Sequence, residues 1–277
     1  MSDDRIELSA ADVPADVPSR DTIVQLCDDA GYCQNGLCIE VAGRPRFWVK
    51  YGAAITLGEA RTQKQVAEIA NADPEGVVGV PEVYLVFSRG NCRYIVMQHV
   101  EGVTVESRQS SSGKYAEDDL KAVVAAVEWL LTLRMPANTP PGPVGGGPIG
   151  HDFFLECQST RVYPTVQHLQ DQINKLVAPQ GLSVDFSSEI KDGLVLCPSD
   201  IHPSNFMIDS SGRLFVIDFG CTCYMPPSYV AFSFERAWEP FMQMVVRRVK
   251  FPQSSNVAAM RVAAGLLVVT GNNSLGK

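Results

Sequence analysis

Residues 194–220, LVLCPSDIHPSNFMIDSSGRLFVIDFG, constrain the fold of this chain more than any other stretch. Their apolar runs predict short buried strands at 194–197, 206–208 and 214–217, with a turn at 209–212. Three polar residues stand between and after these strands: Asp200, Asn205 and Asp218. Desolvating charged groups at strand ends costs free energy, and a bound metal ion would offset that cost.

Composition and charge limit the classes of partner. A chain of 277 residues can form one large domain or two lobes, and its net charge of −8 argues against nucleic acid or an anionic membrane as a partner. The first twenty residues lack the basic start and apolar run of a signal peptide, and the apolar stretch 257–270 is too short to span a membrane. Eight cysteines without a secretory signal are expected to be reduced, structural thiols, which predicts a cytoplasmic protein.

The pattern of apolar residues changes near residue 100. Residues 1–20 are predicted to form a flexible arm, 21–100 a small β-rich lobe, and 101–277 a larger helical lobe. Strands are predicted at 22–27, 37–41, 47–51, 82–88 and 92–100, and helices at 56–72, 116–135, 165–178, 228–247 and 255–270. The predicted fold class is therefore α+β, with a small antiparallel lobe containing one helix and a larger α-helical lobe.

The spacing of the three polar residues is typical of kinase catalytic machinery. Asn205 follows Asp200 by five residues, and Asp218 follows Asn205 by thirteen. Phe219 and Gly220 come directly after Asp218. The first Asp can deprotonate an attacking hydroxyl, while the Asn and the second Asp offer hard oxygen ligands to Mg²⁺. The alternative, an ordinary hairpin with polar ends, is less favoured by three such residues at this spacing.

The segment PSDIHPSNFMIDSSGRLFVIDFG resembles the catalytic segment of the aminoglycoside phosphotransferase-like kinases, in particular fungal members of unassigned substrate. This resemblance implies a two-lobed, protein-kinase-like fold and the use of ATP and Mg²⁺. It implies that residues 21–100 bind the nucleotide and that residues 101–277 carry the catalytic loop, the metal site and the acceptor pocket. It implies that Asp200 is the catalytic base and that Asn205 and Asp218 hold Mg²⁺. His202 and Pro203 match positions that shape the catalytic loop in the family.

The resemblance extends into the first hundred residues. RFWVKYG is similar to the strand that carries the nucleotide lysine, here Lys50, and TLGEARTQKQVAE resembles the helix whose Glu59 would pair with it. A Lys on an apolar strand and a Glu in the next helix can form an ion pair near the ATP phosphates. YIVMQHVEGVTV resembles the hinge, which implies that Met97 lies behind adenine and that backbone groups of Gln98 and Val100 bind it.

Two departures from the family pattern bear on the function. Pro198 and Ser199 replace the usual His-Gly before the catalytic Asp, which predicts a looser site. The region of the Gly-rich loop has only Gly31 and Gly36, which predicts weak or atypical nucleotide binding. Phosphorylation of a protein substrate is a lesser possibility, because no APE-like element follows Asp218-Phe219-Gly220. Two main functions remain open. One is phosphotransfer from ATP to a hydroxyl of a small molecule; the other is a kinase-fold protein without phosphotransfer, serving as a binding module or for another reaction.

The charge of the C-terminal segment indicates the class of acceptor. Residues 219–277 contain two acids and six bases, so this segment carries +4 and the remainder −12. Aminoglycosides carry several ammonium groups, which require carboxylates in the binding site. The sequence therefore predicts a neutral, apolar or anionic small-molecule acceptor, such as a secondary metabolite, rather than an aminoglycoside.

Overall fold

The computed structural model of the protein describes residues 5–31, 36–73 and 76–269. The chain forms two compact units. The first comprises Met1–Val103 and Met207–Gly220, and the second comprises Thr104–Phe206 and Cys221–Lys277. Among the helices in the described ranges, none is both long enough and apolar enough to cross a membrane.

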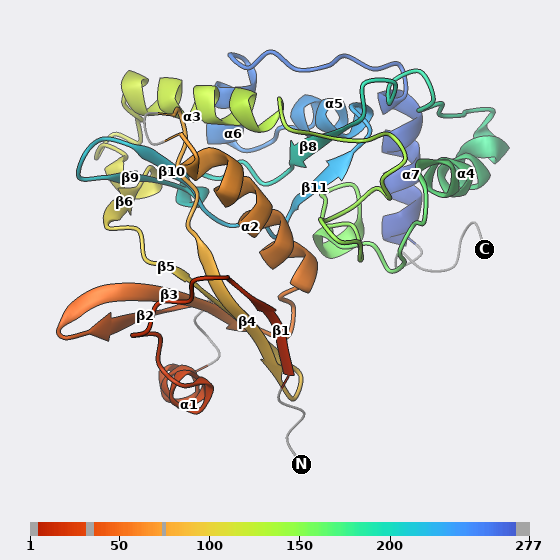
Figure 1. The fold of residues 1–277 in the computed structure, drawn as a ribbon. Coiled ribbons are helices and arrows are strands. Elements are labelled where there is room, and N and C mark those ends of the chain that lie inside the picture. Colours follow the sequence, from red (N-terminus) through yellow and green to blue (C-terminus); the bar gives the residue numbers. More distant parts are fainter. Residues whose placement is uncertain (1–4, 32–35, 74–75, 270–277) are drawn as a thin grey trace. The chain divides into compact units, whose positions relative to one another are not determined.

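A five-stranded antiparallel sheet is the centre of the first unit (Figure 1). Its strands are β1 (Arg5–Ser9), β2 (Gly36–Val41), β3 (Arg44–Gly52), β4 (Val83–Arg89) and β5 (Cys92–Gln98). They lie in the order β1-β4-β5-β3-β2, so β3 and β5 are neighbours, with Lys50 opposite Ile95. The unit also contains helices α1 (Arg20–Ala30) and α2 (Leu57–Asn71).

The two helices cover opposite faces of this sheet, because side chains alternate between the faces along each strand. On one face, Val49 of β3 packs in a buried cluster with Ile23 of α1. On the other face, Ile95 of β5 packs in a cluster with Ala60 of α2. Lys50 follows Val49 in β3, so its side chain is directed to the face that α2 covers.

The predicted strand at 22–27 is wrong, because these residues form part of helix α1. The side chain of Ser19 caps the helix by accepting a hydrogen bond from Thr22 N at 3.2 Å. Ile23 and Cys27, four residues apart, form its buried side. The apolar residues of this segment therefore follow a helical period rather than the alternation of a strand.

The prediction of a flexible arm at residues 1–20 is also wrong for residues 5–9, which form β1 at the edge of the sheet. β1 pairs with β4, and Arg93 Nε on β5 donates a hydrogen bond to Glu7 Oε2 at 2.5 Å. Arg93 also donates to the backbone oxygen of Ile55. The segment has too few apolar residues to be recognised alone, and its order comes from this pairing and from the ion pair.

The hairpin at 207–220 belongs to the first unit, although the predicted boundary near residue 100 assigned it to the helical lobe. Its sheet contains β6 (Gly102–Thr104), β9 (Phe206–Asp209) and β10 (Leu214–Val216), in the order β10-β9-β6. Gly79 N donates to Leu214 O at 2.8 Å, and Val216 N donates to Gly79 O at 2.9 Å. These backbone bonds attach the hairpin to the segment before β4.

The second unit is mainly helical (Figure 1). Its helices are α3 (Glu117–Leu130), α4 (Val166–Val177), α5 (Ser228–Glu235), α6 (Pro240–Val246) and α7 (Val257–Val269), with short 3-10 turns η1 (Glu106–Arg108), η2 (Leu155–Cys157), η3 (Ala178–Gln180) and η4 (Pro203–Asn205). A small antiparallel sheet contains β7 (Arg134–Met135), β8 (Leu194–Pro198) and β11 (Thr222–Met225), in the order β11-β8-β7. Every residue of β8 is buried, so this strand anchors the loop that follows it.

The predicted α+β class is confirmed, with three differences in the helices. In its described residues the first unit has two helices rather than one, because α1 replaces the predicted strand. The predicted apolar helix at 228–247 is two helices, since Pro240 begins α6 and has no N–H to continue a preceding helix. The helices predicted at 56–72 and 165–178 are confirmed as α2 and α4. The helix predicted at 116–135 is confirmed only in part, because α3 ends at Leu130 and residues 134–135 form strand β7.

Candidate active site

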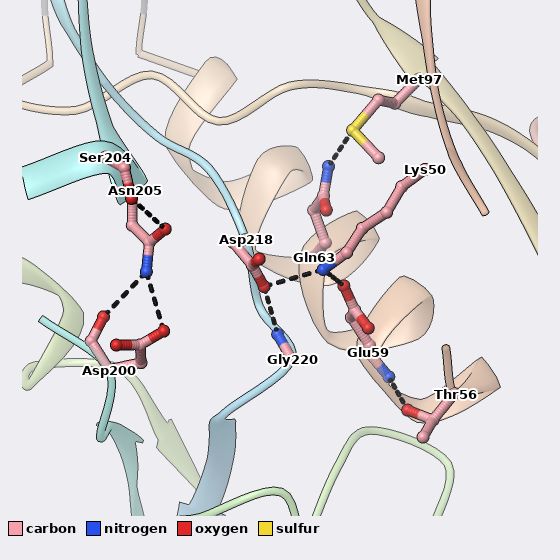
Figure 2. Close-up of polar contacts among 10 residues, drawn as sticks. All are labelled: Lys50, Thr56, Glu59, Gln63, Met97, Asp200, Ser204, Asn205, Asp218 and Gly220. Carbon is pink, nitrogen blue, oxygen red and sulfur yellow. Dashed lines mark hydrogen bonds and ion pairs between the residues drawn. The ribbon is translucent and has the colours of Figure 1, made fainter. Parts of the chain in front are cut away.

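The first group of candidate residues surrounds Lys50 in the first unit. Lys50 Nζ lies 2.5 Å from Glu59 Oε1 and 2.9 Å from Asp218 Oδ1 (Figure 2). Strand alternation directs Lys50 toward α2, and the first turn of α2 carries Glu59. The structure therefore forms the Lys50–Glu59 ion pair that the sequence predicts, and Asp218 joins it from the end of the β9–β10 hairpin.

Glu59 is positioned by the start of α2. Thr56 is the N-cap residue, and its Oγ1 accepts a hydrogen bond from Glu59 N at 3.0 Å. The side chain is almost completely buried, at 5% exposure. Burial raises the pKa of Glu59, and the charge of Lys50 opposes this rise only in part. Burial of the charged Glu59 carboxylate costs free energy, and the ion pair with Lys50 offsets part of that cost.

Asp218 adopts a left-handed backbone conformation, with φ of 64°, which Asp and Asn tolerate better than most residues. This conformation lets its Oδ1 accept a hydrogen bond from Gly220 N at 2.9 Å as well as the contact from Lys50. Burial opposes ionisation, but Lys50 and the Gly220 bond hold the pKa of Asp218 below its usual value. For Lys50, burial lowers the pKa while Glu59 and Asp218 raise it more, so the lysine is charged.

The hinge candidates lie at the end of β5. Met97 is buried, and its Sδ accepts a hydrogen bond from Gln63 Nε2 at 3.3 Å. Gln98 N donates to Glu82 O at 2.8 Å, so a hydrogen bond from the Gln98 backbone to adenine would have to use its carbonyl oxygen. Val100 is buried two residues further on. For Gln98, the structure thus leaves the carbonyl oxygen as the backbone atom that could bind adenine.

Gln63 is a residue that the sequence analysis does not single out. It is 1% exposed, and its Nε2 donates to Pro81 O at 3.0 Å in addition to Met97. Glu59 and Gln63 are one turn apart on the same side of α2, so one side of this helix contacts both Lys50 and Met97. The sequence did contain one sign of this role: Gln63 is a polar residue four positions after Glu59, on the inward-facing side of the helix.

The second group of candidates lies in the loop between β8 and β9, in the second unit. Asn205 Nδ2 donates to the backbone oxygen of Asp200 and to its Oδ2, both at 3.1 Å (Figure 2). The Asp200 residue is exposed, so its carboxylate is accessible to an acceptor from solvent. Because the amide nitrogen of Asn205 faces Asp200, its Oδ1 is directed away from that carboxylate.

His202 shapes the turn that ends at Asn205. Its Nδ1 accepts a hydrogen bond from Ser204 N at 3.3 Å and so caps η4, which begins with the buried Pro203. On the other side of the ring, Nε2 lies 3.7 Å from Glu239 Oε2. These contacts indicate that the His202 side chain helps to fix the shape of the turn between Asp200 and Asn205.

Ser199 braces the same loop by its own hydrogen bonds, while the looser site expected from the loss of the usual His-Gly stays a prediction. Ser199 N and Oγ both donate to Cys221 O, at 3.0 and 2.9 Å, and Asp152 N donates to Ser199 Oγ at 3.2 Å. A glycine at this position could not make the two side-chain bonds. Ser199 is thus a supporting residue whose role the sequence analysis missed.

Asn205 and Asp218 fit the requirements of Mg²⁺ in their chemistry. Mg²⁺ prefers hard oxygen ligands, and the two residues offer an ionised carboxylate and an amide oxygen. In the described ranges no group of three or more His, Cys, Asp or Glu side chains could hold a metal ion. A magnesium site of this protein would therefore combine few protein ligands with water and phosphate oxygens, which is common for nucleotide-bound Mg²⁺.

The candidates thus fall into two groups that the structure brings together separately. Lys50, Glu59 and Asp218 are in contact within the first unit, and Asp200 and Asn205 are in contact within the second. Between Gly31 and Gly36, residues 32–35 lie outside the described ranges, so weak or atypical nucleotide binding stays a prediction.

Comparisons with solved structures show the fold. The structure of aminoglycoside phosphotransferase APH(4)-Ia matches this chain with a TM-score of 0.50 and 17% sequence identity, over 86% of this chain and 83% of the other. A spectinomycin phosphotransferase, APH(9)-Ia, solved with ADP and spectinomycin, matches at a TM-score of 0.45 and 11% identity, over 95% and 91%. The first match confirms the two-lobed, protein-kinase-like fold class. No curated protein matches the sequence.

The family itself follows from the sequence match. The model of the phosphotransferase enzyme family matches residues 53–234. This range is more than half of the chain and includes Glu59, Asp200, Asn205 and Asp218; it begins after Lys50. The chain therefore belongs to the phosphotransferase enzyme family.

Proposed function

We propose that this protein transfers a phosphoryl group from ATP to a hydroxyl of a small molecule, with Mg²⁺ as cofactor. The observation that carries the proposal is the contact of Lys50 Nζ with both Glu59 and Asp218, at 2.5 and 2.9 Å. Strand β3, helix α2 and the β9–β10 hairpin converge on one half-buried cation, an arrangement that suits phosphate binding and is costly as a mere structural device.

Each candidate residue has a role in this reaction. Lys50 would bind phosphate oxygens of ATP, and Glu59 would hold the lysine in position. Asp200 would accept a hydrogen bond from the acceptor hydroxyl, orient it and take its proton as the hydroxyl attacks. When bound by Asn205 and Asp218, Mg²⁺ would neutralise negative charge on the phosphate groups.

The adenine base would be held by the end of β5. Met97, which is buried, would lie behind the ring, at the back of the adenine pocket. The carbonyl oxygen of Gln98 would accept from the amino group of adenine, and the N–H of Val100 would donate to a ring nitrogen. This places specificity for the base on the backbone, whose donors and acceptors do not depend on side-chain conformation.

Addition of ATP with Mg²⁺ is expected to raise the melting temperature of the protein, because a ligand that binds only the folded state stabilises it. At a free concentration about 100 times Kd, the gain is about 2.7 kcal/mol, which corresponds to several degrees. Differential scanning fluorimetry with MgATP, with ATP and EDTA, and with Mg²⁺ alone measures it.

The thermal titration also addresses the alternative of a kinase-fold protein without phosphotransfer. That alternative is favoured by the substitution at Pro198 and by the lack of a Gly-rich loop. No shift with any of the three additions would contradict nucleotide use and support the alternative. A shift with MgATP but no ADP formation over a library of metabolites would support a role in binding alone.

The acceptor is proposed to be neutral, apolar or anionic. Both carboxylates of the basic C-terminal segment have partners: Glu235 Oε2 lies 3.1 Å from Arg261, and Glu239 lies 3.7 Å from His202. Elsewhere in the second unit, Glu189 accepts hydrogen bonds from Ser228 and Asn256. These three carboxylates are therefore already engaged and are less able to match the ammonium groups of an aminoglycoside.

Kanamycin-type aminoglycosides are accordingly expected to bind no better than millimolar at physiological salt, because unmatched ammonium groups lose their hydration without compensation. Isothermal titration calorimetry in the presence of MgATP measures the affinity. The variant Arg261→Ala, which would free the Glu235 carboxylate, is a matched control and should bind slightly better. Micromolar affinity of the parent protein, or resistance conferred on a sensitive host, would contradict this prediction.

A further inference from the structure

The loop between β3 and α2, residues 53–56, determines where Glu59 lies. Its last residue, Thr56, caps α2, and Thr56 Oγ1 accepts a hydrogen bond from Glu59 N at 3.0 Å (Figure 2). Ile55, which precedes the cap, is buried at 7% exposure. A contact that holds the backbone at Ile55 therefore also holds the first turn of α2, from which Glu59 reaches Lys50.

Arg93 of β5 makes such a contact. One nitrogen of its guanidinium, Nη1, donates a hydrogen bond to the carbonyl oxygen of Ile55. Arg93 and Ile95 are two residues apart on β5, so their side chains are directed to the same face of the sheet. This is the face that α2 covers, because Ile95 packs in a cluster with Ala60. Strand β5 thus holds both the helix and the loop before it.

Glu7 of β1 binds the other two nitrogens of the same guanidinium. Arg93 Nε donates to Glu7 Oε2 at 2.5 Å, and Arg93 Nη2 donates to Glu7 Oε1 at 3.2 Å. The side chains of Glu7 and Arg93 are 13% and 26% exposed. Two parallel bonds to one carboxylate fix the orientation of a planar guanidinium. Glu7 therefore keeps Nη1 directed at the Ile55 carbonyl.

A β-bulge in β1 brings Glu7 to this position. The register of β1 on β4 shifts between Ile6 and Leu8, so Glu7 is the extra residue between two cross-strand pairs. In a regular strand, Glu7 and Leu8 would be directed to opposite faces of the sheet. Here Glu7 bonds to Arg93, while Leu8 packs against the apolar cluster on the α2 side of the sheet. The bulge thus gives two consecutive residues of β1 contacts on that side.

We propose that Glu7 and Arg93 are positioning residues, which hold the start of α2 where Glu59 pairs with Lys50. The path is continuous: Glu7 orients the guanidinium, the guanidinium holds the backbone before the N-cap, and the N-cap begins the helix. The edge strand β1 would thereby control a contact in the candidate active site. The importance of that contact for catalysis rests on the proposed function, whereas the positioning concerns only residues of the first unit.

The Glu7–Arg93 pair is largely buried, so its replacement can be designed to spare the stability of the fold. Removal of one partner leaves an unpaired buried charge and destabilises a protein, whereas replacement of both by apolar residues of similar volume is often neutral. The double variant Glu7→Leu with Arg93→Met is therefore expected to keep the melting temperature within about 3 °C of that of the parent. It nevertheless removes the bond to the Ile55 carbonyl.

The readout is acylation of Lys50 by acetic anhydride in the full-length protein without ligand, measured by mass spectrometry. The Lys50 side chain is 18% exposed and lies between Glu59 and Asp218, so it should react slowly in the parent. The double variant is expected to raise the rate at Lys50 about fivefold, because the first turn of α2 opens more often. Lys64 is an internal reference whose rate should not change, since its partner Glu68 lies on the same helix.

Two single variants are matched controls. Asp21→Asn removes an ion pair with Arg89 that joins α1 to β4, where the two groups lie 2.6 Å apart. Val24→Ala removes an apolar contact on the face of the sheet that α1 covers, and it should lower the melting temperature. Both should leave the Lys50 rate at the parent value. A rise with Val24→Ala as large as that of the double variant would attribute the effect to lost stability and overturn the proposal.

The proposal is also overturned if the double variant folds and its Lys50 reacts no faster than that of the parent. Should the double variant not fold, Glu7→Gln decides, because glutamine keeps one acceptor oxygen and loses the charge. Glu7→Gln is expected to raise the Lys50 rate about twofold, and an unchanged rate overturns the proposal. A parent protein that does not bind MgATP would contradict the proposed function alone, because the acylation needs neither nucleotide nor acceptor.

Discussion

Replacement of Asp200 by asparagine is expected to lower turnover by about 10²–10⁴-fold, the usual effect of removing a general base, while the affinity for ATP changes little. Asparagine keeps the shape of the side chain and an oxygen that can accept from Asn205 Nδ2, a bond of 3.1 Å in the structure. The loop should therefore keep its form, and the loss should reflect the missing base. Measuring kcat and the KM for ATP by ADP formation, with any acceptor that supports turnover, tests this prediction.

Asp192→Asn is the matched control for this experiment. Asp192 is an exposed aspartate just before β8, whereas Asp200 follows the same strand. The control should leave kcat and KM unchanged. Equal losses in turnover and ATP affinity for Asp200→Asn would instead place Asp200 among the nucleotide ligands, and a parent protein without turnover would favour the role in binding alone.

The contact of Lys50 with Glu59 could be predicted because two local rules determine it. Alternation along β3 directs Lys50 to one face of the sheet, and Thr56 determines where α2 begins. The loop to this helix is short, so Glu59 in its first turn has to lie over that face. Each rule can be applied to the sequence without knowledge of the rest of the fold.

Residues 20–30 could not be assigned correctly by local rules. Ile23, Val24 and Leu26 give a short apolar run that suits a strand as well as a helix. The helical pairing of Ile23 with Cys27 becomes decisive only when the sheet that both residues pack against is present. The strand at residues 5–9 could not be predicted for the same reason, because β1 depends on pairing with β4, which is distant in the sequence.

The bracing of the catalytic loop was also beyond sequence reasoning. The resemblance to the family predicted a loss at Pro198, whereas the bonds that hold the loop come from Ser199 and from residues distant in the sequence. Local patterns predicted the residues of the site, and the tertiary fold determines the contacts that support them.

Replacement of Asp218 by asparagine is expected to abolish the magnesium-dependent part of ATP binding. Asp218 supplies the anionic oxygen of the proposed Mg²⁺ pair, and a neutral amide is a much weaker ligand for this hard cation. Asparagine is preferable to alanine, because it tolerates the left-handed φ of 64° and can still accept the hydrogen bond from Gly220 N. The measurement is the thermal shift with MgATP compared with ATP and EDTA.

The stability of the Asp218→Asn variant separates this effect from misfolding. Lys50 remains paired with Glu59 at 2.5 Å, and removal of Asp218 relieves its repulsion of the buried Glu59 carboxylate, so the melting temperature without ligand should not fall. Asp209→Asn is the matched control on the same hairpin, where the Asp209 carboxylate accepts from Ser211 and Arg213 within the turn. This control should keep the full shift with MgATP. An Asp218→Asn protein that binds MgATP as tightly as the parent would remove Asp218 from the metal site, and the roles of Lys50 and Glu59 would then have to be explained without Mg²⁺.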